Sequence, residues 1–311
     1  MKYKKRRFVP GECMHIYQRA VKGFNIFYDL EDFLVFYTIF ATVARQYAVT
    51  VMEMCVMIDH IHVLLSSMSL SEISRFVMHY TSMFVREYNS DVGRKGPLFH
   101  KSFGSAPKSG MKLLRTAIAY LFNNPVERHL CKYAQDYRWN FLAYGKSGHP
   151  FSDPLVLRKA SFALKRAVTE IDGSRKRGAH LTYPQLRRLF SGLDEREKNQ
   201  LIDYIIVKYS IVRYDILTTS CYEGYENMIT AINSNAGSEY DIDEQRCGRS
   251  DAVYRDLYKF VRSRGYSSVG DVIALDYEAK MSLYKAMKSV TNVLGYHICK
   301  FLHLTLADTK K

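Results

Sequence analysis

Two histidines separated by one residue, His60 and His62, lie in a stretch that otherwise has the composition of a buried strand, Met57-Ile58-Asp59-His60-Ile61-His62-Val63-Leu64-Leu65. Because side chains alternate between the two faces of a strand, both imidazoles point to the same side, with Cα atoms roughly 6.5 to 7 Å apart. Two imidazole nitrogens at that spacing can bind one metal ion. Taken alone, so short a motif favours a simpler interpretation, a hairpin with one histidine solvated and one packed.

A second polar pair follows about sixty residues later, in Tyr120-Leu121-Phe122-Asn123-Asn124-Pro125. The helical periodicity from residue 111 to 124 places Tyr120 and Asn124 one turn apart on one face, with Cβ atoms about 5 to 6 Å apart. A phenol and an amide oxygen are therefore presented together. The chain holds 24 tyrosines, and most of them must serve packing, so spacing alone does not distinguish Tyr120 from the others.

The elements that must position these pairs follow from hydrophobic periodicity in the first half of the chain. Strands are predicted at 13–20, 49–57, 61–66 and 98–103, and helices at 30–46, 69–89 and 111–124, with a loop at 104–110. Asp59 and His60 are typical of a tight turn between two strands, and Ser69 and Glu72 of a helix cap. This order predicts an α+β fold: a ferredoxin-like antiparallel sheet with helices on one face.

The second half of the chain is helix-rich and strand-poor. We therefore predict one domain over residues 1–149 and a helical accessory region over 150–311. Residues 275–304 have the pattern of a helix, a turn near 292–295 and a second helix, similar to the first two helices of a helix-turn-helix. This pattern leaves two interpretations of the accessory region, DNA binding and helical packing or dimerisation.

Charge indicates a polyanionic partner. Lysine and arginine outnumber aspartate and glutamate by 45 to 31, which gives a net charge of +14. Nucleic acid is favoured over an anionic membrane because no basic amphipathic anchor stands out. The sequence contains no apolar stretch long enough to cross a membrane and no signal peptide, and its six cysteines form no CxxC pair. We therefore expect a cytoplasmic, nucleoid-associated protein with reduced thiols and no membrane partner.

Four sequence blocks occur in order between residues 10 and 146: His60-Ile61-His62, Gly93-Arg94-Lys95-Gly96-Pro97-Leu98-Phe99, Tyr120-x-x-x-Asn124-Pro125-Val126 and Tyr137-Arg138-Trp139-Asn140-Phe141-Leu142-Ala143-Tyr144. In the order and spacing of these blocks the chain resembles the single-tyrosine HUH transposases, in particular the REP-associated tyrosine transposases and their insertion-sequence relatives. Asn140-Phe141 departs from that family's usual Ser-Ser, and we expect the difference to affect packing more than chemistry.

The resemblance implies a set of roles. His60 and His62 would hold a divalent metal, Asn124 would supply a third ligand, and Tyr120 would be the nucleophile that cleaves single-stranded DNA beside hairpins. Attack by a tyrosine oxygen gives a 5′-phosphotyrosine and a free 3′-hydroxyl that can later rejoin strands. A free tyrosine has a pKa of about 10, so a nearby cation or base must assist. We expect Mg²⁺ or Mn²⁺ in function, although zinc or nickel could also bind such ligands.

Basic residues near these blocks are candidates for contact with DNA phosphates. They are Lys5, Arg6 and Arg7 near the start, Arg19 on the first predicted strand, and Arg94, Lys95 and Lys101 around the basic turn. A solvated tail explains the first group nearly as well, and a structural role is equally open for Arg19 and for His15 on the same strand. Asp59 either orients His60 or serves the turn.

Together these patterns predict a metal-dependent transposase that cleaves and rejoins single-stranded DNA through Tyr120. The first alternative is a non-catalytic regulator that binds hairpins or single-stranded DNA with the same fold. A more distant one is a rolling-circle initiator or plasmid relaxase with the same histidine pair. A homodimer could also place Tyr120 of one chain beside His60 and His62 of the other.

Overall fold

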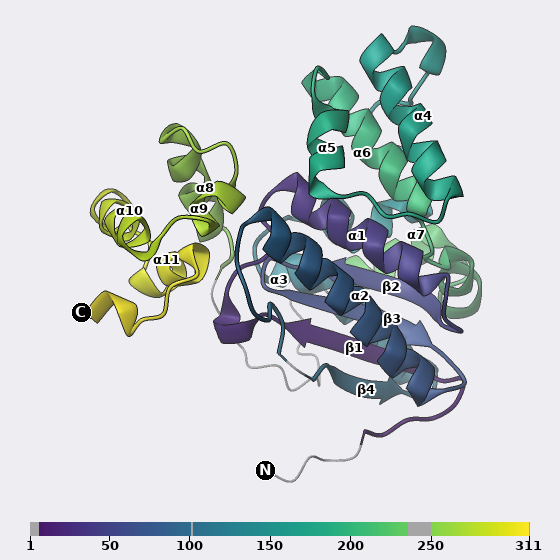
Figure 1. Cartoon of the computed structure of the whole chain (residues 1–311). Helices are drawn as coiled ribbons and strands as arrows, with labels where there is room; N and C mark the ends of the chain where they lie inside the picture. Colours follow the sequence, from purple (N-terminus) through teal and green to yellow (C-terminus); the bar gives the residue numbers. More distant parts are fainter. Residues whose placement is uncertain (1–5, 101, 236–249, 311) are drawn as a thin grey trace.

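A four-stranded antiparallel sheet lies at the centre of the molecule (Figure 1). The computed structural model describes residues 6–100, 102–235 and 250–310. The strands are β1 (Cys13–Arg19), β2 (Thr50–Val56), β3 (His60–Ser66) and β4 (Gly104–Lys108), in the order β2-β3-β1-β4. Every neighbouring pair is antiparallel, so the α+β fold with an antiparallel sheet is confirmed.

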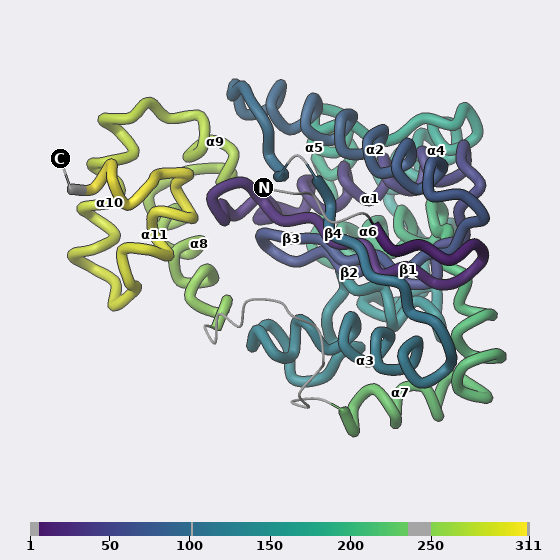
Figure 2. Tube along the Cα trace, turned by 90° about the horizontal axis from the view of Figure 1, so that it is seen from below, coloured from purple at the N-terminus to yellow at the C-terminus, as the bar shows by residue number. Residues whose placement is uncertain are grey.

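Helices cover both faces of this sheet. Helices α1 (Leu30–Ala44) and α2 (Leu70–Asp91) pack on one face, and α3 (Met111–Glu127) lies on the other (Figure 2). The prediction of helices on one face only is therefore right for α1 and α2 and wrong for α3. The physical reason is visible in β3, where the neighbouring residues Val63 and Leu64 point to opposite faces and are both buried. A sheet that is apolar on both faces needs a layer on each.

Local signals fix where the helices begin. Ser69 accepts a hydrogen bond from the backbone N–H of Glu72 at 3.4 Å, as expected of a cap for α2. At the start of α1, Asp29 and Asp32 form a reciprocal capping box. Helix α3 continues past its predicted end at residue 124 to Glu127, because Pro125 lies in the last turn, where it removes only one helical hydrogen bond.

The fourth strand lies later in the chain than predicted. Of the predicted strand at 98–103, residue 101 lies outside the described residues and the others form no strand: Leu98 and Phe99 are core residues, and Phe99 makes only a single bridge to Ala20. The predicted loop at 104–110 instead contains β4. Gly104 permits this pairing because it has no side chain. The Tyr17 ring lies directly over it, and a Cβ there would be 1.9 Å from Tyr17 Cζ. Because β4 lies at the edge of the sheet, it can contain a proline.

The remainder of the described chain is mostly helical, as predicted. Its helices are α4 (Phe162–Lys176), α5 (Tyr183–Phe190), α6 (Glu195–Tyr209), α7 (Tyr225–Ser234), α8 (Val253–Ser263), α9 (Val269–Ile273), α10 (Tyr277–Val290) and α11 (Gly295–Leu302). Short 3-10 turns lie at Val21–Gly23, Ala134–Asp136, Arg138–Asn140, Leu142–Gly145, Leu157–Lys159 and Asp308–Lys310, and a π-helix at Ile216–Cys221. None of the helices in the described ranges is long and apolar enough to cross a membrane.

Two helical groups pack against the sheet domain. Helices α5 and α6 contact α1, and α7 contacts α3, while α8 to α11 form a group at the end of the sheet where the β2–β3 hairpin turns (Figures 1 and 2). One continuous apolar cluster includes buried residues of the sheet, of α4 to α6 and of α8 to α11. The domain boundary near residue 149 stays a prediction.

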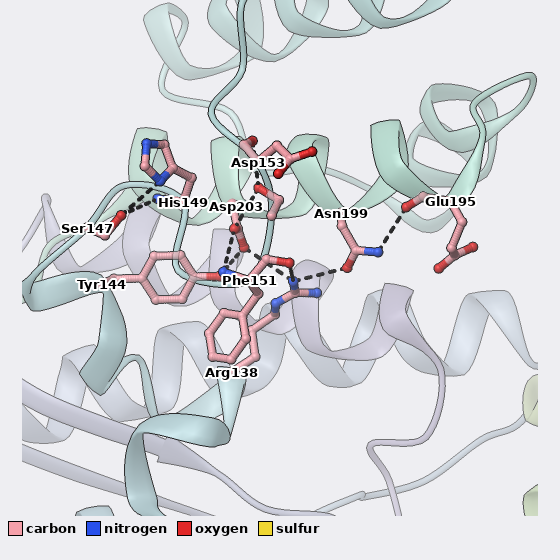
Figure 3. Close-up of polar contacts among 10 residues, drawn as sticks. Arg138, Tyr144, Ser147, His149, Phe151, Asp153, Glu195, Asn199 and Asp203 are labelled. Atoms are coloured by element: carbon pink, nitrogen blue, oxygen red, sulfur yellow. Dashed lines mark hydrogen bonds and ion pairs between the residues drawn. The ribbon is translucent and has the colours of Figure 1, made fainter.

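A buried carboxylate ties α6 to the segment that follows α3 (Figure 3). Asp203 is 1% exposed. It accepts hydrogen bonds from the Tyr144 hydroxyl at 2.7 Å, the Phe151 backbone N–H at 3.1 Å and the Ser152 hydroxyl at 2.9 Å. The Arg138 guanidinium lies 3.4 Å from the same carboxylate. This network fixes the position of residues 138–152 on the helical group.

Candidate active site

The two histidines lie on the face of β3 that α3 covers. In the strand register His60 pairs with Arg19 and His62 with Tyr17 of β1, so these four side chains share one face of the sheet. His60 is 4% exposed and His62 is fully buried. The prediction that both imidazoles point the same way is confirmed, and the alternative with one solvated histidine is wrong.

Asn124 reaches down from α3 between the two imidazoles. Its Oδ1 lies 3.3 Å from His60 Nε2, and its Nδ2 donates to His62 Nε2 at 3.3 Å. The ring centroids of His60 and His62 are 4.8 Å apart. A strand and a helix thus bring three side chains with metal-binding capacity to one point, because Asn124 occupies the face of α3 that packs on the sheet.

Tyr120 lies one helical turn before Asn124, beside the same imidazoles. Its ring centroid is 5.8 Å from that of His62 and 6.2 Å from that of His15. The side chain is 6% exposed. A single chain therefore gathers the phenol, the amide and the two imidazoles.

Asp59 orients the His60 imidazole. The Nδ1–H of His60 donates to Asp59 Oδ1 at 2.6 Å, which leaves Nε2 as the nitrogen that faces Asn124. Lys300 of α11 lies 3.8 Å from the other carboxylate oxygen. Burial raises the pKa of Asp59, but the hydrogen bond from His60 and the charges of His60 and Lys300 outweigh it and hold that pKa well below its usual range. The carboxylate is therefore ionised and holds His60 in one orientation.

His15 supports His62 in a similar way, which is the structural role that the sequence left open for it beside DNA contact. His15 Nε2 lies 2.9 Å from His62 Nδ1, and both rings are buried. Since Asn124 donates to His62 Nε2, the matching tautomer donates from His62 Nδ1 to His15. Burial and then the neighbouring charge of His60 lower the pKa of His62 well below its usual value, so this imidazole is neutral. Only the β1–β3 register, which sequence does not give, identifies His62 as the partner of His15.

These side chains fit a divalent metal. The outer nitrogens of the two imidazoles are held by Asp59 and His15, and the inner nitrogens face one amide. Within the described part of the chain, no three His, Cys, Asp or Glu side chains gather as a metal site. A three-ligand site at this position therefore needs the amide oxygen of Asn124, which imidazole-binding divalent metals accept.

The basic residues predicted to contact DNA lie in separate places. Arg19 is on the site face of β1. Arg94 is committed to its own turn, where it donates to Asn89 Oδ1 at 2.9 Å and to the Pro97 carbonyl at 3.3 Å. Arg6 donates to the Phe103 carbonyl, and Arg7 and Lys95 are exposed. Lys5 and Lys101 lie outside the described residues.

Comparison with known proteins identifies a family for the segment that contains this site. Residues 25–124 match the model of a family described as "Transposase IS200 like". This segment belongs to the IS200-like transposase family. The IS200-like segment includes His60, His62, Tyr120 and Asn124, and it ends at Asn124. The family resemblance seen in the sequence is confirmed over this segment.

One solved structure is similar to part of this chain. It is a REP-associated tyrosine transposase bound to a REP hairpin, with 16% sequence identity and a TM-score of 0.36. The similarity covers 45% of this chain and 81% of that one. No curated protein matches the chain.

Proposed function

We propose that this protein is a metal-dependent transposase that cleaves and rejoins single-stranded DNA near hairpins through a phosphotyrosine formed on Tyr120. One observation carries the proposal: Tyr120, Asn124, His60 and His62 meet within one chain, in an IS200-like segment, although they come from a helix and a strand. Packing alone does not require a buried polar cluster, since burying polar groups costs free energy.

Each residue has a defined task in this proposal. His60, His62 and Asn124 would hold Mg²⁺ or Mn²⁺, and Asp59 and His15 keep the two imidazoles in the orientation that ligation needs. When bound, such an ion polarises the scissile phosphate and offsets the negative charge that develops there.

Tyr120 makes the new bond. Its phenolic oxygen forms a bond to phosphorus while the bond from phosphorus to the 3′ oxygen breaks. The phenolic proton leaves to solvent, and the 3′ oxygen takes up a proton from solvent to become the 3′-hydroxyl. One phosphodiester replaces another, so the 3′-hydroxyl can reverse the reaction on a second strand without ATP. Arg19, on the site face of β1, is the described basic residue nearest to His60 in the register, and we assign it to phosphate contact.

The test is a search for the covalent adduct. Labelled single strands with hairpins, taken from the DNA that flanks the gene, are incubated with protein and Mn²⁺ or Mg²⁺ and separated on a denaturing gel. Wild type should form the adduct and Tyr120→Phe should not. Tyr133→Phe is the matched control, because Tyr133 is 43% exposed. An adduct that persists in Tyr120→Phe refutes the nucleophile, and binding without any adduct favours a non-catalytic DNA-binding regulator.

We further propose that the site acts within one chain. Mixing His60→Ala with Tyr120→Phe should then restore no cleavage, because neither chain holds both the nucleophile and a complete ligand set. Restored cleavage in the mixture would instead establish a dimer in which Tyr120 serves the partner chain.

A further inference from the structure

A cavity lies beside the candidate active site, between the β2–β3 hairpin and α8. Its volume is about 580 Å³, within the range of pockets that bind small ligands. Ile58 lines it, two residues before His60 on the same hairpin. Tyr137 and Trp139 line one part, and Tyr254 and Tyr258 of α8 line another. The cavity thus connects the transposase domain to the α8–α11 group.

Its aromatic walls are held in place by contacts behind them. Trp139 stacks on Phe33 with ring centroids 4.4 Å apart and an interplanar angle of 12°. The Tyr137 hydroxyl donates to the Val56 carbonyl at 2.9 Å, and the Tyr254 hydroxyl is 3.0 Å from a nitrogen of His297. Rings that are already fixed lose little conformational entropy when a flat ligand stacks on them.

One wall carries a buried carboxylate that lacks a partner. Asp251 is 8% exposed, and its backbone N–H donates to the Arg128 carbonyl at 3.0 Å. Its carboxylate makes no hydrogen bond or ion pair with any residue of the described ranges. Burial, and after it the charge of Asp59, raises the pKa of Asp251 to about 6, while the charges of Arg128, His60 and Lys300 act in the opposite direction. A buried carboxylate without donors is costly, so a ligand with N–H groups would satisfy it.

The charge at the rim suits a nucleic acid strand. Arg255 and Lys259 are exposed on α8 and line the same cavity. They are one turn apart on the helix, so both point to the same side. The combination of aromatic rings with nearby cations is the one by which proteins bind unpaired bases.

We propose that this cavity binds one unpaired nucleobase of the DNA strand, and guanine in preference to the other bases. The base would stack on the aromatic walls, with its N1–H and N2–H donating to the Asp251 carboxylate. Guanine is favoured because it alone presents two adjacent donors to the two oxygens of a carboxylate. The inference rests on the proposed function, which brings a single strand to the neighbouring His60.

The experiment measures binding without cleavage, in EDTA. Thymine oligonucleotides carrying a single guanine, inosine or adenine are titrated against the full chain by fluorescence anisotropy. Guanine should bind more tightly than inosine, which lacks the N2 amino group, by about 5-fold to 150-fold, the range for one bidentate base contact. Asp251→Asn should abolish this preference, whereas Asp256→Asn, which changes an exposed residue of α8 outside the cavity, should keep it.

Stacking has its own test. Tyr258→Leu should weaken binding of all bases alike by about 5-fold to 150-fold, as for loss of one base–aromatic contact. Tyr277→Leu is the control, since Tyr277 is 44% exposed on α10. Equal binding of guanine and inosine by wild type overturns the proposal even if a variant does not fold. A guanine preference without any cleavage supports the guanine site and refutes the transposase mechanism. Cleavage without a guanine preference supports the mechanism and refutes the guanine site.

Discussion

Replacing Asp59 with asparagine removes the charge that orients the first histidine and leaves the shape of the side chain unchanged. The His60 Nδ1–H donates to Asp59 Oδ1 at 2.6 Å, and Lys300 lies 3.8 Å from Oδ2. Asparagine offers a donor as well as an acceptor to His60, so the imidazole is no longer held with Nε2 available for a metal. We expect weaker metal binding by a folded protein.

The magnitude follows from this one contact. A hydrogen bond to a charged group contributes about 1.5 to 3 kcal/mol, and loss of such an orienting partner lowers metal affinity by about 10-fold to 100-fold. The Asp59 side chain is 25% exposed, so water replaces part of the lost interaction. We therefore expect a loss near the lower end, about 10-fold to 30-fold.

Isothermal titration of Mn²⁺ into the full chain measures this loss without any cleavage. Lys300→Met, which acts on His60 only through Asp59, should lose less, about 2-fold to 3-fold. Asp153→Asn is the control, because that carboxylate forms an exposed ion pair with Arg196. An Asp59→Asn protein with wild-type thermal stability and Mn²⁺ affinity within about twofold of wild type would refute the assigned role of Asp59.

Three further predictions concern stability, each measured by urea unfolding. Asp203→Ala should lower the free energy of unfolding by about 3 to 5 kcal/mol, because it leaves Arg138 buried without its carboxylate; a loss below about 1 kcal/mol contradicts this. Burial raises the pKa of Glu53 well above its usual value, so the folded state keeps a proton that the unfolded state releases above about pH 4.5. Glu53 should therefore contribute a loss of about 1.4 kcal/mol per pH unit above that pH, until the folded pKa is passed, and the slope of Glu53→Met should differ from that of wild type by this amount. Gly104→Ala should cost about 1 to 3 kcal/mol, because the new Cβ meets the Tyr17 ring; unchanged stability would show that the ring can move.

Local patterns identified the elements that depend on local physics. The hairpin with His60 and His62, the cap of α2 and the helix with Tyr120 and Asn124 follow from periodicity and capping chemistry, and all three are present. The predicted strand at 98–103 failed because apolar composition does not separate a strand from core residues in a loop. β4 was missed because glycine, alanine and proline carry no strand signal, and pairing with β1 decides its position.

The sequence by itself determined which residues could do chemistry: two imidazoles on one strand face, and a phenol and an amide on one helix face. Those spacings depend only on the fixed repeat of strands and helices. The tertiary structure decided that the two faces meet, that His15 and Asp59 hold the imidazoles, and that α8 closes an aromatic cavity beside them. Except for that of Asp59 with its neighbour His60, these contacts join residues far apart in the chain, and they depend on strand register and on packing of the whole core, which no local pattern encodes.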